Sequence, residues 1–115
     1  MPHDAARFLP LKPEVFEILL ALSEGELHGY AILKTLDARE VHVAPSLLYR
    51  KLRRLMDDDL VAEARRAARP GADPRRRYYR LTALGRAVLQ EEAMRIVELA
   101  RNRQVRLLAD EVGHA

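Results

Sequence analysis

The stretch PSLLYRKLRRLMDDD (Pro45–Asp59) predicts a helix with two unlike sides in this chain of 115 residues. Leu48, Leu52 and Leu55 recur at a spacing that returns them to one side of a helix with about 3.6 residues per turn. The opposite side carries Ser46, Arg50, Arg53 and Arg54, with Tyr49 on its flank. One side can therefore pack against a core while the other presents positive charge to a partner.

Two helices are expected before this one, and two strands after it. The first helix covers about residues 13–22, because Pro13 is tolerated in a first helical turn and apolar residues follow at helical spacing; the second covers about residues 28–39. Short alternating runs at residues 60–64 and 76–81 predict a β-hairpin. The loop between them is rich in proline and glycine and contains Arg65, Arg66, Arg69 and Arg75. The hairpin therefore has a cationic tip.

A single long helix is expected at the C-terminal end, from Ala83 to about Glu111, with Thr82 as its N-cap. Apolar residues cover about half of its circumference, which is more than one side of a small domain requires. A second copy of the chain is the expected cover. The residues assigned to this dimerisation surface are Leu89, Met94, Ile96, Val97, Ala100, Val105 and Leu108.

Three short helices, a hairpin and a long closing helix predict a mainly α fold with a small β-hairpin. This order is that of a winged helix-turn-helix with an appended C-terminal dimerisation helix. We expect an N-terminal lead-in at residues 1–10, a DNA-binding domain at residues 11–82 and the dimerisation helix at residues 83–115. A chain of this length suits one hydrophobic core, to which Tyr30 and Tyr79 are assigned.

Positive charge is concentrated in one part of the sequence. Residues 50–80 contain eleven Lys or Arg and five Asp or Glu, whereas the rest of the chain contains nine and twelve. Arginine pairs well with phosphate, so double-stranded DNA is the expected partner. The third helix would enter the major groove while the hairpin reaches the adjacent backbone or minor groove. The residues expected to contact DNA are Ser46, Tyr49, Arg50, Arg53, Arg54, Arg75, Arg76 and Arg77.

Other classes of site lack support in the sequence. The chain has no cysteine and its four histidines lack the spacing of metal ligands, so no metal or cofactor is expected, and His28 is assigned a structural or capping role. No catalytic constellation and no glycine-rich phosphate loop is found, which predicts that the protein is not an enzyme. The longest apolar stretch, residues 18–22, is too short to span a bilayer, and the N-terminus has no signal segment. We therefore expect a cytoplasmic protein without membrane contact.

Three segments resemble, in order and spacing, the signature segments of the PadR family of winged-helix transcriptional regulators. They are LHGYAIL (27–33), LLYRKLRRLMDDDLV (47–61) and RRYYRLTALGR (76–86), and the match spans about residues 11–86. The single predicted C-terminal helix is similar to that of the shorter PadR subfamily. The resemblance implies a homodimer that represses transcription at a pseudo-palindromic operator, often with release by a small molecule bound at or near the dimer interface.

The sequence departs from the pattern of that family at three positions. Ala44 stands where Ser or Thr usually caps the third helix, which removes a cap worth about 1 kcal/mol. Leu47 replaces a common threonine, so no polar DNA contact is assigned to it. Asp59 replaces a usual glycine, and it tolerates a left-handed backbone better than most residues do.

Two alternatives concern the ligand and the function. The last predicted helix contains no Trp, Tyr or Phe that could stack on a flat drug. A small apolar effector could lie against Met94, Val97 and Phe8, although packing between two chains is the alternative use of all three.

A second functional hypothesis is a winged-helix protein-interaction module, whose arginines contact an acidic partner and which binds no specific DNA.

Overall fold

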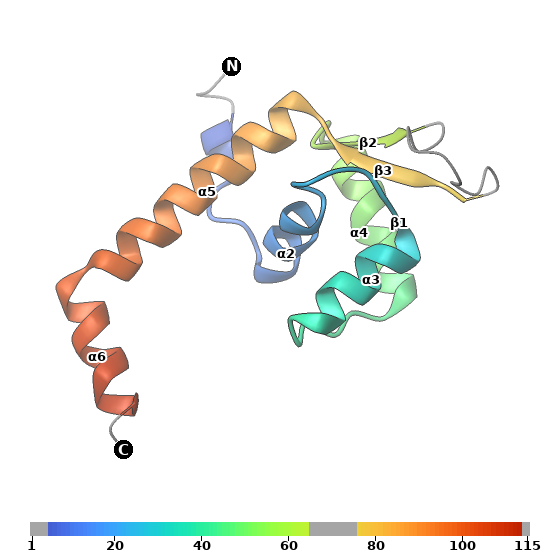
Figure 1. Cartoon of the computed structure of the whole chain (residues 1–115). Helices are drawn as coiled ribbons and strands as arrows, with labels where there is room; N and C mark the ends of the chain where they lie inside the picture. The colour runs from blue at the N-terminus through green and yellow to red at the C-terminus, as the bar shows by residue number, and fades with distance from the viewer. Residues whose placement is uncertain (1–4, 65–75, 114–115) are drawn as a thin grey trace.

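Helix α4 (Pro45–Asp57) forms where the cationic stretch predicted it, in a computed structural model that describes residues 5–64 and 76–113. Its predicted apolar side is confirmed, because Leu48, Leu52 and Leu55 are all buried. The other elements (Figure 1) are η1 (Ala6–Phe8), α2 (Pro13–Ala21), β1 (Leu27–His28), α3 (Gly29–Ala38), β2 (Val61–Ala64), β3 (Tyr78–Leu81), α5 (Ala83–Arg101) and α6 (Arg103–Gly113).

A three-stranded antiparallel sheet joins the helices, with β3 between β1 and β2. The two predicted strands are confirmed as β2 and β3, which pair with Val61 opposite Leu81. Strand β1 was not predicted: only Leu27 and His28 pair with β3, and two residues are too few to show an alternating pattern. The three helices, the sheet and the projecting β2–β3 hairpin form a winged helix, as predicted (Figure 1).

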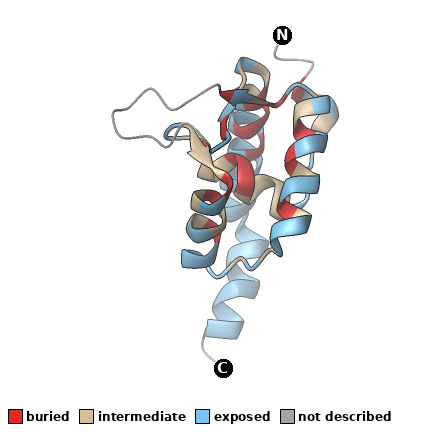
Figure 2. Ribbon diagram, turned by 90° about the vertical axis from the view of Figure 1, so that its right-hand side faces the viewer, coloured by how far each residue is buried: buried red, intermediate tan, exposed pale blue. Residues whose placement is uncertain are grey.

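One hydrophobic core connects α2, α3, α4, the sheet and the start of α5. Its largest buried members are Ile18, Leu19, Leu22, Ile32, Leu36, Leu48, Leu52, Leu55, Leu60, Val61, Tyr79, Val88 and Leu89. Figure 2 shows buried residues in the body of the domain and in the first turns of α5, whereas α6 is exposed throughout. The core position of Tyr79 is confirmed, but that of Tyr30 is wrong, because 60% of Tyr30 is exposed on the first turn of α3.

The helix ends and turns follow the chemistry of their residues. The Nδ1 atom of His28 accepts a hydrogen bond of 3.2 Å from the N–H of Ala31, so the predicted capping role is confirmed for α3. Ala44 provides no side-chain cap for α4, which begins instead with Pro45. Asp59 adopts a left-handed backbone, with φ of 62°, a conformation that aspartate tolerates better than most residues do.

Thr82 holds the junction between the wing and the last helices. Its hydroxyl donates a hydrogen bond of 2.6 Å to the carbonyl of Asp59 and accepts one of 2.9 Å from the N–H of Gly85, so the predicted N-cap is confirmed. Gly85 packs so closely against the carbonyl of Leu60 that a Cβ atom would overlap it. Glycine is required because α5 crosses the backbone before β2 at this point.

The C-terminal arm, which consists of α5 and α6, is bent, so the prediction of one continuous helix from Ala83 to about Glu111 is wrong. Helix α5 ends before Asn102, whose backbone is extended, and α6 begins after it. The Asn102 side chain accepts a hydrogen bond of 3.0 Å from the N–H of Val105, as the N-cap of a new helix does. Asparagine competes with helical hydrogen bonding in this way. Figure 1 shows α6 turned away from the line of α5.

Candidate nucleic-acid interface

The side of α4 that faces away from the core is polar and cationic. The five residues that the sequence assigned to it are all exposed: Ser46, Tyr49, Arg50, Arg53 and Arg54. Leu48 and Leu52 fix the rotation of the helix by packing in the core, so the cationic side has to point outward. An exposed helix of this kind fits the major groove of B-form DNA, which is about 12 Å wide.

The arginines on this side differ in their intramolecular partners. Arg54 Nε lies 3.2 Å from Asp58 Oδ2, one turn further along α4. Arg50 and Arg53 form no ion pair or hydrogen bond with another residue in the described ranges. An exposed ion pair contributes only about 0–1 kcal/mol, so phosphate could replace Asp58 beside Arg54. Arg50 and Arg53 have no carboxylate partner among the described residues that phosphate would have to replace.

The wing places two of the predicted arginines beside other elements. Arg76 Nη1 lies 2.7 Å from His28 Nε2, and Arg77 Nε lies 3.6 Å from Glu63 Oε2. The predicted contact Arg75 lies outside the described residues, together with Arg65, Arg66 and Arg69. In the described part of the wing, the predicted DNA contacts are therefore Arg76 and Arg77.

Tyr49 connects α4 with α3 and with the wing. Its hydroxyl lies where a Cβ atom on Gly29 would be, so only glycine permits this contact. The side chain remains partly exposed, and it lines a pocket of about 330 Å³ together with Tyr30, Arg76, Arg77 and other residues of β1, α3 and β3. Burial raises the pKa of the Tyr79 phenol on the wall of this pocket, and nearby Tyr49 and Glu63 add to that rise. Tyr79 is protonated at neutral pH even at its ordinary pKa of about 10, and the rise extends this state to higher pH.

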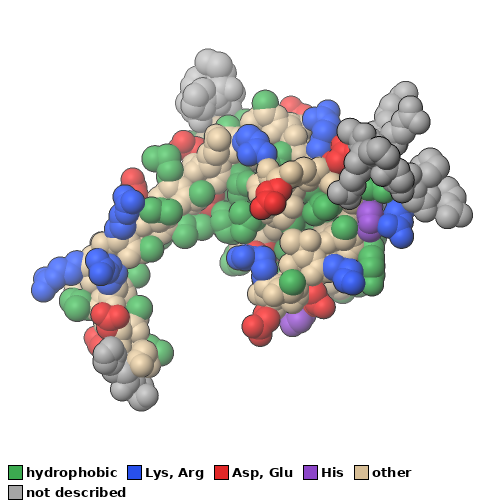
Figure 3. Space-filling model, in the orientation of Figure 1, with side chains coloured by type: hydrophobic (Ala, Val, Ile, Leu, Met, Phe, Trp, Pro, Cys, Tyr) green, Lys and Arg blue, Asp and Glu red, His purple; other side chains and the backbone are tan. Residues whose placement is uncertain are grey.

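Most residues predicted for dimerisation lie exposed on the arm. These are Met94, Ile96, Val97, Ala100, Val105 and Leu108. The assignment of Leu89 to the dimerisation surface has to be corrected. Leu89 is only 6% exposed and belongs to the core of its own chain, because the first turns of α5 pack against α2. Leu99, Leu107 and Val112 are exposed on the arm as well. Figure 3 shows hydrophobic side chains along both helices of the arm.

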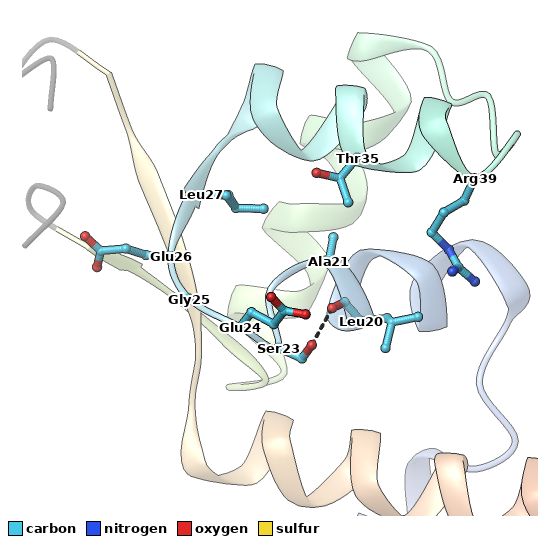
Figure 4. A pocket seen from close by; sticks show the side chains of 9 residues that line it. All are labelled: Leu20, Ala21, Ser23, Glu24, Gly25, Glu26, Leu27, Thr35 and Arg39. Carbon is cyan, nitrogen blue, oxygen red and sulfur yellow. Dashed lines mark hydrogen bonds between the residues drawn. The ribbon is translucent and has the colours of Figure 1, made fainter. Parts of the chain in front are cut away.

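The residues expected around an effector do not share one pocket. Met94 and Val97 line a groove of about 250 Å³ on α5, whereas Phe8 lines a different pocket between the lead-in and α4. A larger pocket, of about 560 Å³, lies between α2, α3 and the turn before β1 (Figure 4). Several of its polar groups are already engaged: Ser23 Oγ donates to the carbonyl of Leu20, and Arg39 pairs with Glu17 at 2.7 Å.

Metal-ion sites and membrane-spanning helices are both absent from the described part of the chain. No group of three or more His, Cys, Asp or Glu side chains there is placed to hold a metal ion. Over the same residues, no helix has both the length and the apolar character needed to cross a bilayer.

The sequence and the fold both resemble those of known transcriptional regulators. A model of the Transcriptional regulator PadR-like family matches residues 18–91. The transcriptional regulator Rv3488 of Mycobacterium tuberculosis is 37% identical over 84 residues, which cover 73% of this chain and 76% of that protein.

Solved structures share this fold. A PadR-like transcription factor from Bacteroides fragilis aligns with a TM-score of 0.64 and 28% identity, over 76% of this chain and 84% of its own. PadR of Bacillus subtilis, solved in complex with operator DNA, aligns with a TM-score of 0.58 and 24% identity. The alignment covers 70% of this chain and 46% of the PadR chain. The matched family consists of regulators and not of enzymes, in agreement with the prediction from the sequence. The family match and the similarity to Rv3488 show that this chain belongs to the PadR-like family of transcriptional regulators.

Proposed function

We propose that this regulator binds double-stranded DNA sequence-specifically as a homodimer and represses transcription from a pseudo-palindromic operator. One observation carries the proposal: Arg50 and Arg53 are exposed on a helix whose other side is anchored in the core. A helix held in this way can present its cationic side to a groove without rearrangement of the domain. This function would be exercised in the cytoplasm.

The proposed DNA contacts divide into two kinds. Arg50 and Arg53, one turn apart on α4, would read base edges in the major groove, where arginine binds guanine through two hydrogen bonds. The other proposed contacts would position the domain on the sugar–phosphate backbone. They are Ser46, Tyr49 and Arg54 on α4, Arg76 and Arg77 on the wing, and Arg75 outside the described residues.

Dimerisation is proposed through residues 83–115, the segment that contains α5 and α6. Exposed apolar side chains such as Met94, Val97 and Leu108 would be removed from water by a second copy of the arm. A twofold dimer would present two α4 helices to half-sites about 34 Å apart, one turn of DNA. This arrangement would account for a pseudo-palindromic operator.

A small apolar effector is proposed to act on the same arm. Met94 and Val97 line a groove that a partner chain would help to close. A ligand with a higher affinity for one arrangement of the two arms would change the spacing of the α4 helices and thereby lower operator affinity.

The test starts from the full-length chain and a random library of DNA duplexes. Bound duplexes are selected and sequenced, and the affinity for a selected and a scrambled duplex is measured by fluorescence anisotropy at physiological salt. Arg50→Ala combined with Arg53→Ala should reduce the preference for the selected duplex, at about 1–3 kcal/mol per lost base contact. Arg103→Ala combined with Arg106→Ala is the control, since it removes two exposed arginines from α6.

Enrichment of a motif with two half-sites, together with loss of preference in the α4 variant alone, would support the proposal. Weak binding that salt abolishes, without any enriched motif, would contradict it. That second outcome is the one expected of a protein-interaction module.

A further inference from the structure

Tyr30 is an exposed aromatic residue on the first turn of α3, outside the set assigned to DNA contact. It is 60% exposed, more than Tyr49 on α4. Among the described residues, no hydrogen-bond partner of the Tyr30 hydroxyl is found. A large aromatic side chain that is mostly exposed suits contact with another molecule, because it offers apolar area and a polar group together.

Neighbouring side chains restrict the Tyr30 ring. The His28 ring lies parallel to it, with the two centroids 6.5 Å apart, and the Nζ atom of Lys34 lies 5.7 Å from its centroid. His28 is itself held by its hydrogen bond with the N–H of Ala31. Tyr30 and Lys34 therefore form a partly ordered aromatic–cationic pair on the surface of α3, and little conformational freedom would be lost on binding.

The pair is continuous with the proposed DNA surface. Tyr30 shares the pocket of about 330 Å³ with Tyr49 of α4 and with Arg76 and Arg77 of the wing. The charged or titratable groups that line this pocket, tyrosines aside, are His28, Arg76 and Arg77, and no carboxylate is among them. Outside this lining, the Glu63 carboxylate lies 3.6 Å from the Nε atom of Arg77. The charge and the position of the pair match a polyanion that already contacts α4.

We infer that Tyr30 and Lys34, together with Arg76 from the pocket that Tyr30 lines, clamp the sugar–phosphate backbone that borders the groove entered by α4. The Tyr30 hydroxyl donates a hydrogen bond to a phosphate oxygen, and the Lys34 ammonium group neutralises phosphate charge. Both residues lie on α3 and not on the helix in the groove, so the clamp positions the domain and reads no base. This inference rests on the proposed DNA-binding function.

The experiment measures affinity by fluorescence anisotropy for the selected operator duplex and for a scrambled duplex, from low to moderate salt. Tyr30→Phe removes only the hydroxyl, and Lys34→Gln removes only the charge. Arg103→Gln on α6 is the control for loss of one exposed positive charge, and circular dichroism melting checks that each variant is folded. All variants are made in the full-length chain.

Tyr30→Phe should weaken binding to both duplexes by the same factor, about three- to tenfold, and leave their ratio unchanged. Lys34→Gln should reduce the slope of log affinity against log salt by about 1. Parent-like binding by both variants, or a changed ratio between the two duplexes in Tyr30→Phe, would overturn the clamp. If the parent binds no DNA, the proposed function fails as well; if only the α4 variant loses affinity, the clamp fails alone.

Discussion

The backbone N–H of Leu11 donates a hydrogen bond of 3.0 Å to the carboxylate of Glu92, a residue 81 positions later in the chain. Glu92 is 1% exposed on α5, and its Oε1 atom also lies 2.7 Å from Arg95 Nε. One buried carboxylate thus links the start of the winged-helix domain to the segment proposed for dimerisation.

Replacement of Glu92 should make stability less dependent on acid. Hydrogen bonding to Arg95 holds the pKa of the Glu92 carboxyl below its ordinary value, against the effect of burial, and the Leu11 N–H adds to this lowering. A lowered folded-state pKa stabilises the fold above the unfolded pKa, about 4.3, and this contribution is lost as pH falls through the folded pKa. Glu92→Gln should therefore unfold more easily near neutral pH, by about 1–3 kcal/mol, and resemble the parent in acid.

Urea unfolding at several pH values measures this difference. Glu91→Gln, an exposed neighbour on α5, is the control and should behave like the parent throughout. An equal loss of stability at every pH would show that the Glu92 charge does not contribute.

Gly85→Ala should destabilise the fold. The added Cβ atom would overlap the carbonyl of Leu60, and both groups belong to packed backbone that cannot rotate away. Overpacking of this kind costs about 1–3 kcal/mol. Gly113→Ala is a matched control, since its Cβ would meet no atom within 4 Å. Thermal unfolding of both variants checks the prediction, and equal midpoints would contradict the close approach of α5 to Leu60.

Gly29→Ala should displace Tyr49 while leaving the fold intact. The new Cβ would collide with the Tyr49 hydroxyl, which is the end of a rotatable side chain and can move aside at little cost. If Tyr49 contacts DNA as proposed, operator affinity should fall although the melting temperature changes little. A double-mutant cycle with Tyr49→Ala measures the coupling. Strictly additive losses would indicate that Gly29 acts on DNA binding by another route.

Val97→Glu or Leu108→Glu should dissociate the proposed dimer. Both residues are exposed apolar side chains of the arm, and a buried unpaired carboxylate in each copy would oppose association. Sedimentation velocity at micromolar concentration distinguishes dimer from monomer. Arg106→Glu places the same charge on α6 outside the assigned surface, so it should preserve the dimer. A parent chain that sediments as a folded monomer would refute the dimer itself.

The principal helices and the hairpin could be predicted because their signals are local. Pro45, the leucine spacing of α4 and the Thr82 cap each act within one turn of chain. The exposed cationic side of α4 followed from the same spacing, since burying one side of a helix exposes the other. The break at Asn102 also had a local signal, an asparagine able to cap α6, which the apolar periodicity across it obscured.

The sequence by itself determined which side of each helix is apolar, where most helices begin and where positive charge gathers. Only the tertiary structure decided that Leu89 and Glu92 are covered while Tyr30 is not, and that Leu27 and His28 form a third strand. The reason is physical: periodicity reports the direction of a side chain around its own helix or strand. Whether another element lies in that direction depends on packing between residues far apart in the chain.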